Sequence, residues 1–128
     1  MSKNSISFIV AIFIGLCLVS VGVAALVAPR FTSAMFGIAA TDDSARVYVY
    51  ATGMRDIVIG GWLVAVLGAG PRMFGASLLL LALVPIGDAI NVWMNATAPS
   101  AIALAVHISS AIVFLVFGFW FRFGRGGT

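Results

Sequence analysis

Four long apolar runs dominate the pattern of hydrophobic and polar positions along the chain. They cover residues 6–28, 47–69, 73–96 and 99–121. An α-helix needs about 20 residues to cross a hydrocarbon core about 30 Å thick, and each run is long enough. The runs are apolar on every helical face, whereas strands of a membrane β-barrel alternate apolar and polar side chains. Because a helix satisfies its own backbone hydrogen bonds in lipid, the pattern predicts an all-α, four-helix integral membrane bundle.

The composition favours the same fold. Apolar residues make up 62% of the 128 residues, charged residues make up 9%, and the mean hydropathy is +1.18. Soluble domains carry about 25% charged residues, so this chain lacks the side chains to cover a water-facing surface. We therefore expect residues 1–128 to form one transmembrane domain in a lipid bilayer. The first run is longer than the 7–15-residue apolar core of a signal peptide, and we interpret it as a span.

The connection between the first two spans is the longest one. Pro29 ends the first helix, and apolar residues then recur at helical spacing from Phe31 to Ile38. This pattern predicts a short helix at the membrane interface, with an unstructured loop as the alternative. Thr41 is expected to cap the second span, with Asp42 and Asp43 in its first turn, where the helix dipole favours anions.

The basic residues favour one orientation in the membrane. Four of them fall on the side of the termini and two on the other side, as follows: Lys3, Arg72, Arg122 and Arg125 against Arg30 and Arg46. Cytoplasmic loops of membrane proteins carry the excess of Lys and Arg. We therefore expect a multi-pass protein of the cell (inner) membrane with both termini in the cytoplasm.

Five polar side chains interrupt the last three apolar runs: Arg55, Asp56, Asp88, Asn91 and His107. Counting outward from the two short turns between these spans places Asp88 level with Arg55 and with His107. An Arg or Asp at a helix centre costs about 2.5–3.5 kcal/mol to insert, so Arg55 and Asp56 together cost roughly 5–7 kcal/mol. The second span therefore needs polar partners from the third and fourth. Pro85, one turn before Asp88, is expected to kink the third span.

The charges of this set suggest acid–base chemistry. Arg55 with Asp56 and Asp88 leaves one net negative charge, so we expect the set to hold a proton on His107 or on one carboxylate. In this hypothesis one Asp is the base, the other is a protonated acid, and Arg55 holds the pair or a substrate oxygen. The remaining candidate residues orient water or substrate or form apolar walls: Tyr48, Asn91, His107, Trp62, Met54 and Phe114.

Several other classes of function lack the residues they need. The lone His107 and the lone Cys17 lie at different depths and cannot supply a zinc ligand set, so no metal is expected. The chain also has no glycine-rich phosphate loop, so no organic cofactor is expected. Nucleic acid is not expected either, because no basic patch is free to meet it.

Three short motifs carry a family resemblance. They are the run GMRDIVIGG from Gly53 to Gly61, which holds a G-x-R-D motif, the PR-x5-FG stretch after the first span, and the pair Gly87-Asp88. They resemble a family of small, uncharacterised four-helix membrane proteins of bacterial type, itself distantly similar to the DoxX group. The resemblance implies the four-helix fold and a shared site of Arg55, Asp56 and Asp88, but no reaction. Separately, the residue types resemble the water-activating set of limonene-type epoxide hydrolases, which are soluble and have a different fold.

Three functions fit these observations. The first is a pocket that binds a lipophilic small molecule and performs epoxide-hydrolase-like or isomerase-like chemistry on it. This hypothesis predicts a cavity that touches Arg55 and Asp88. A sealed and fully paired set would instead favour the second, a non-enzymatic accessory or scaffold subunit of a membrane complex. The third is proton-linked transport, which would need a homo-oligomer because the chain shows no inverted repeat.

The predicted orientation can be tested by labelling single cysteines in intact cells and in inverted vesicles. Cysteines at Lys3 and Thr128 should react from the cytoplasmic side, and a cysteine at Asp43 should react from outside. The opposite labelling pattern would overturn the orientation.

Overall fold

The fold comes from a computed structural model that describes residues 3–124. Its helices are α1 (Lys3–Val27), α2 (Pro29–Phe36), α3 (Asp43–Ala65), the 3-10 helix η1 (Val66–Ala69), α4 (Pro71–Leu81), α5 (Leu83–Asn95) and α6 (Ala101–Phe123), with no strand among the described residues. Four helical stretches are long and apolar enough to cross a membrane: Ser5–Val27, Asp43–Ala69, Pro71–Asn95 and Ala101–Phe123. The predicted all-α four-helix membrane bundle is confirmed, and the second span begins before the expected residue 47. Arg125 and Thr128, used above for the orientation, lie outside the described residues.

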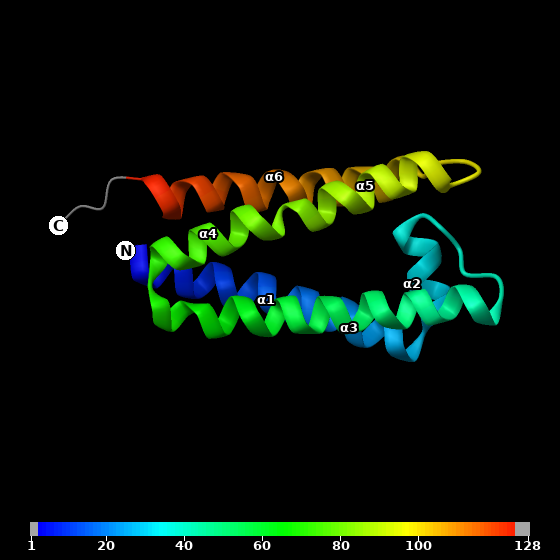
Figure 1. Ribbon diagram of the computed structural model, residues 1–128, viewed down its shortest axis with the longest axis horizontal. Coiled ribbons are helices and arrows are strands. Elements are labelled where there is room, and N and C mark those ends of the chain that lie inside the picture. Colours follow the sequence, from blue (N-terminus) through cyan, green and yellow to red (C-terminus); the bar gives the residue numbers. More distant parts are fainter. Residues whose placement is uncertain (1–2, 125–128) are drawn as a thin grey trace.

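The long helices form two antiparallel pairs that lie side by side (Figure 1). One pair is α1 with α3, and the other is α6 with α4 and α5, which follow each other along one line. At one end of the bundle the chain turns from η1 into α4 at Gly70, and we call this the Gly70 end. At the opposite end, which we call the α2 end, α2 leaves the first pair and reaches toward the second. The two pairs thus share α2 as a bridge.

Glycines let α1 and α3 approach closely. A Cβ atom on Gly22 would lie 2.5 Å from the carbonyl oxygen of Gly53, and one on Gly60 would lie 2.6 Å from that of Gly15. Lipid tails are as apolar as leucine, so helices in a membrane associate through such close backbone packing and not through the hydrophobic effect. The first pair is therefore held together along its length by small residues.

The apolar core of the bundle fills its Gly70 end. Side chains from all four spans meet there, with Phe74 and Phe121 in edge-to-face contact at 5.2 Å between ring centroids. The buried members are Ala11, Ile14, Leu63, Val66, Phe74, Leu78, Ala82, Phe114 and Phe121. The α2 end lacks a comparable cluster among the described residues, so other contacts hold the two pairs together there.

The third span is interrupted where Pro85 predicts a kink. Helix α4 ends at Leu81, α5 begins at Leu83, and Ala82 lies in the turn between them. Pro85 has no N–H to donate to the carbonyl of Leu81, so the helical ladder loses a hydrogen bond at this point. The break separates the part of the span that packs in the core from the part that carries Asp88.

The predicted short helix after the first span is confirmed, and glycine lets its end pack on the second helix pair. Gly37 ends α2 with a φ of 107°, a left-handed conformation that favours glycine. A Cβ atom at Gly37 would lie 2.8 Å from the Cβ of Ala103 and 3.0 Å from Cγ1 of Val92. Beyond it, the buried Ser33 hydroxyl accepts the backbone N–H of Ala40 at 2.9 Å. These contacts fasten α2 and its following loop to α5 and α6.

The N-cap of α3 lies one residue later in the chain than expected. Asp42 is the N-cap of α3, not Thr41, and its Oδ1 accepts the backbone N–H of Ala45 at 2.7 Å. Asp42 caps better than Thr41 here because its charged oxygen can also accept the Ser44 hydroxyl, at 2.6 Å. The Ser44 hydroxyl and then the Ala45 N–H hold the pKa of Asp42 below its usual value.

The packing of α1 on α3 generates a paired test on two neighbouring glycines. Gly60→Ala should destabilise the bundle by about 1–3 kcal/mol, because the new methyl group meets the backbone of Gly15. Gly61→Ala enters open space and should be neutral or stabilise by up to about 1 kcal/mol through helix propensity. The measurement is unfolding in detergent mixed with SDS, followed by circular dichroism. Equal losses in the two variants would contradict this packing.

Candidate functional site

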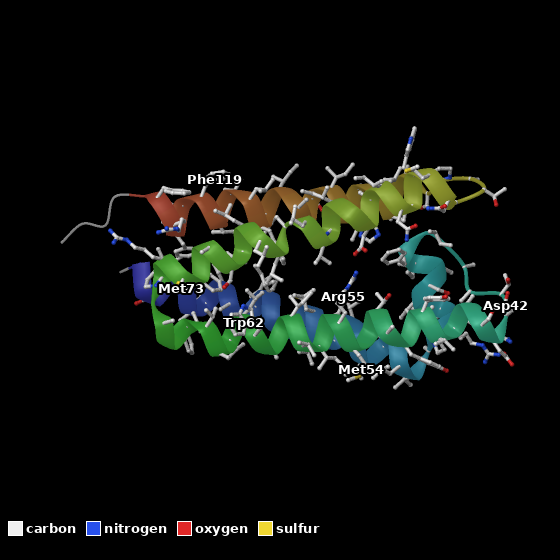
Figure 2. The ribbon with its side chains drawn as sticks, in the orientation of Figure 1. Asp42, Met54, Arg55, Trp62, Met73 and Phe119 are labelled. Carbon is white, nitrogen blue, oxygen red and sulfur yellow. The ribbon has the colours of Figure 1, made fainter. Side chains whose placement is uncertain are left out.

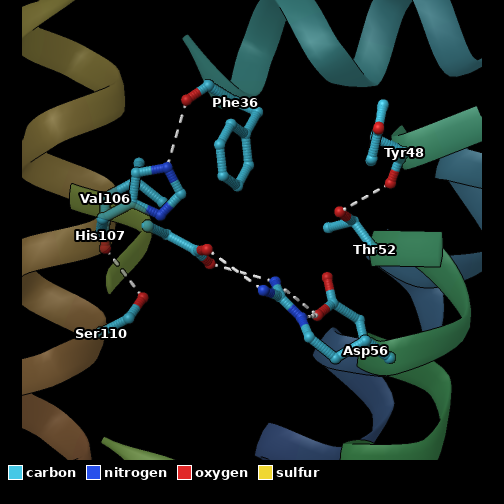
Figure 3. Close-up of polar contacts among 9 residues, drawn as sticks. Phe36, Tyr48, Thr52, Asp56, Val106, His107 and Ser110 are labelled. Atoms are coloured by element: carbon cyan, nitrogen blue, oxygen red, sulfur yellow. Dashed lines mark hydrogen bonds and ion pairs between the residues drawn. The ribbon is translucent and has the colours of Figure 1, made fainter. Parts of the chain in front are cut away.

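Arg55 joins the two helix pairs through a bidentate ion pair with Asp88. Its Nη1 donates to Oδ1 of Asp88 at 3.1 Å, and its Nη2 donates to Oδ2 at 3.0 Å. Its Nε donates to Oδ1 of Asp56 at 3.0 Å. One guanidinium thus binds two carboxylates, one from its own helix and one from α5 (Figure 3). The pairing of Arg55 with Asp88, predicted from the lengths of the turns, is present.

Local structure explains how these three side chains meet. Arg55 and Asp56 are successive residues of α3 and therefore point about 100° apart around the helix. Arg55 extends toward the second helix pair (Figure 2), whereas Asp56 shares the buried side of α3 with Gly53 and Gly60. Asp88 lies on α5, beyond the break at Ala82. We refer to Arg55, Asp56 and Asp88 as the charged cluster.

The charged cluster is only partly shielded. The side chains of Asp56 and Asp88 are 10% and 15% exposed, but that of Arg55 is 35% exposed. Both oxygens of Asp88 accept from Arg55, whereas Oδ2 of Asp56 has no hydrogen-bond partner among residues 5–124. The two carboxylates therefore differ: Asp88 is tied at both oxygens and Asp56 keeps one oxygen free.

His107 lies near the same depth but makes a different contact. Its Nε2 lies 3.2 Å from the backbone oxygen of Phe36, and its ring meets the Phe36 ring edge-on at 4.6 Å between centroids (Figure 3). Because a carbonyl oxygen only accepts, Nε2 carries the proton. His107 therefore ties α6 to the end of α2, where the last carbonyls lack helical partners. Sequence reasoning missed Phe36, since a backbone carbonyl leaves no signal in the side-chain pattern.

The other candidate residues lie away from the charged cluster. Tyr48 is 76% exposed, and Met54 is 51% exposed and points away from the second helix pair (Figure 2). Asn91 is also exposed, and its Oδ1 accepts from Asn95 at 2.8 Å. Trp62 donates its Nε1–H to Ser77 at 3.2 Å, two turns away along α3, and Phe114 is buried in the apolar core. The structure thus brings together Arg55, Asp56 and Asp88, and leaves these five residues elsewhere.

Two hollows on the bundle surface lie at its ends. One has a volume of about 510 Å³ and is lined by Ala28, Pro29, Arg30, Phe31 and Arg46. The other has a volume of about 300 Å³ and is lined by Ser7, Phe8, Leu67, Gly68, Gly70 and Pro71. Neither hollow touches the charged cluster, so the cavity expected there is not one of these two.

The described part of the chain holds no group of three or more His, Cys, Asp or Glu residues placed to bind a metal. The arrangement offers instead one guanidinium, two carboxylates and a single excess negative charge. The chemistry within reach of these side chains is therefore hydrogen bonding and proton transfer.

Comparison with known proteins places most of the chain in one family. A family model described as a domain of unknown function, DUF4267, matches residues 15–121. No curated protein and no solved structure matches the chain. The match agrees with the expected membership of an uncharacterised family, whereas the G-x-R-D motif and the distant similarity to the DoxX group stay predictions.

The contact between Arg55 and Asp88 generates a double-mutant test. Asp88→Asn and Arg55→Gln should each destabilise the bundle, because each leaves a charge without its partner. The double variant should lose less than the sum, with a coupling energy on the order of 1–3 kcal/mol in unfolding by SDS. Asn95→Ala is the control on α5, since the Asn95 side chain bonds, among the described residues, only to Asn91. Strict additivity of Asp88→Asn with Arg55→Gln would show that the pair does not interact.

Proposed function

The chain belongs to the DUF4267 family. We propose that it binds a lipophilic small molecule at the charged cluster and moves a proton from one atom of that molecule to another. One observation carries the proposal. The Arg55 side chain is 35% exposed within a membrane-spanning helix, beside a carboxylate oxygen of Asp56 that has no partner among the described residues.

The exposure of Arg55 favours a ligand over a purely structural contact. An arginine that faces hydrocarbon near a helix centre costs about 2.5–3.5 kcal/mol, so its exposed part is expected to face water or a polar group. A ligand with one polar oxygen and an otherwise apolar body satisfies both demands. Its oxygen accepts a free N–H of Arg55, and its body lies between the helix pairs against apolar side chains.

The two carboxylates support different roles. Asp88 accepts from Arg55 at both oxygens, which fixes the orientation of the guanidinium. Asp56 has one oxygen free to accept a proton. Isomerase-like chemistry fits this division: Asp56 takes a proton from one carbon of the ligand, Arg55 stabilises the charge on the adjacent oxygen, and Asp56 returns the proton to another carbon. This sequence balances without a co-reactant, whereas epoxide opening would also need an acid, a role for which Asp88 is poorly placed.

A second candidate function is that of a non-enzymatic accessory subunit. The observation that favours it is the pairing itself, because every member of the charged cluster has an ionic partner and neither described hollow reaches it. In this case the cluster only sets the register of the helix pairs. The two candidates make opposite predictions about what the purified protein retains.

The test separates binding from chemistry. The full chain is purified in a mild detergent, extracted with organic solvent, and the extract is analysed by mass spectrometry. We expect a lipophilic molecule whose amount falls about tenfold in Arg55→Gln, because one charged hydrogen bond is lost. Asp56→Asn should retain the molecule but lose its proton exchange, measured as deuterium incorporation from heavy water.

Arg72→Gln, at the opposite end of the bundle, is the matched control and should behave as the unaltered protein. The binding function fails if the unaltered protein and Arg55→Gln yield the same extract. In that case a larger complex that is isolated with the unaltered chain would support the accessory subunit. Retained exchange in Asp56→Asn would overturn only the role of Asp56 as the base.

A further inference from the structure

The hollow of about 510 Å³ at the α2 end is lined by positively charged residues that do not belong to the charged cluster. Its lining consists of Ala28, Pro29, Arg30, Phe31 and Arg46. Two of these five residues carry a positive charge and none carries a negative one. The hollow lies where α1 ends at Val27 and α2 begins. This is the end of the first helix pair that is remote from the apolar core. We call this feature the arginine hollow.

The two arginines keep unused donors. Arg30 is exposed, and its guanidinium forms no ion pair or hydrogen bond among the described residues, whereas its backbone oxygen accepts from the Ser33 hydroxyl. Arg46 forms an ion pair with Asp43 on its own helix through Nη2, but its Nε is buried and has no hydrogen-bond partner within the described part of the chain. A buried donor without a partner is destabilising, so an acceptor that enters the hollow would relieve that penalty.

The backbone adds donors to the same place. Pro29 is the first residue of α2, and Ala28 before it offers no side-chain cap. The first backbone N–H of α2 that bonds within the chain is that of Thr32, to the carbonyl of Ala28 at 3.0 Å. The N–H groups of Arg30 and Phe31, at the positive end of the helix dipole, therefore have no acceptor among the described residues. Backbone and side-chain donors together form a site for an anion.

The position of the hollow indicates which anion would reach it. The hollow lies at the ends of two membrane-spanning helices, where the headgroups of a bilayer are expected. Phe31 and Met35, on α2, are 67% and 61% exposed and apolar, so the helix that forms the hollow also offers a surface for acyl chains. Arginine recognises phosphate oxygens with paired N–H groups.

We propose that the arginine hollow binds an anionic phosphate group, supplied by the headgroup of an anionic phospholipid. Arg30 supplies the free guanidinium, Arg46 supplies the unpartnered Nε, and the N-terminus of α2 supplies backbone N–H groups. Asp43 competes for Arg46, so a phosphate shares this guanidinium with it. The proposal concerns other residues than the charged cluster and stands whether or not a small molecule binds there.

The test is native mass spectrometry of the full chain in detergent, titrated with phosphatidylglycerol, with phosphatidylcholine, and with inorganic phosphate alone. Phosphatidylglycerol should bind saturably and more tightly than phosphatidylcholine. Arg30→Gln and Arg46→Gln should each weaken it about tenfold, the loss of one charged hydrogen bond. Arg46→Lys keeps the charge and should weaken it less than Arg46→Gln.

The chain offers a matched control. Arg72 also follows a proline at the start of a helix, at the Gly70 end, but it lines neither described hollow. Arg72→Gln should therefore bind phosphatidylglycerol as the unaltered protein does. Saturable binding of inorganic phosphate that the Arg30 and Arg46 variants weaken would support the phosphate site with a soluble source. Equal binding of all lipids by all variants, or equal losses in the Arg72 variant, would overturn the proposal.

Discussion

An arginine placed inside a membrane-spanning helix must find negative partners, and this constraint shapes the α2 end of the bundle. Arg55 satisfies it with Asp56 on its own helix and with Asp88 on α5. The contact with Asp88 crosses from one helix pair to the other at a level beyond the apolar core. If Arg55 were apolar, the two pairs would depend on the core at the Gly70 end and on α2 alone. The ion pair therefore fixes both the register and the separation of the two halves.

The apolar core and the polar contacts occupy different parts of the same bundle. The Gly70 end is close-packed, with Phe74, Leu78 and Phe121 fully buried or nearly so. The α2 end depends on two directional contacts, Arg55 with Asp88 and His107 with the carbonyl of Phe36, and on the close packing of Gly37 against Ala103. Directional contacts can rearrange around a ligand more readily than a packed apolar core can. This division is the physical basis for placing the proposed binding site at the α2 end.

Helix α2 links the two sites inferred here. Its N-terminus lines the arginine hollow, and its C-terminal carbonyl accepts from His107 beside the charged cluster. The dipole of the helix matches this arrangement, since its positive end meets the proposed phosphate and its negative end meets an N–H donor. A lipid held at one end of α2 would therefore steady the element that covers the other site.

The sequence by itself determined the four spans, the kink at Pro85 and the partnership of Arg55 with Asp88. These follow from run length, from a missing N–H and from the cost of a charge in lipid, combined with short turns that set relative depth. It did not determine the rotation of each helix about its own axis, because the spans are apolar on every face and lipid does not select one. Tertiary packing turned Asn91, Tyr48 and Met54 outward and Arg55 inward. It also gave His107 a backbone partner, since the position of the Phe36 carbonyl depends on how the loop and Gly37 seat α2 against α5 and α6.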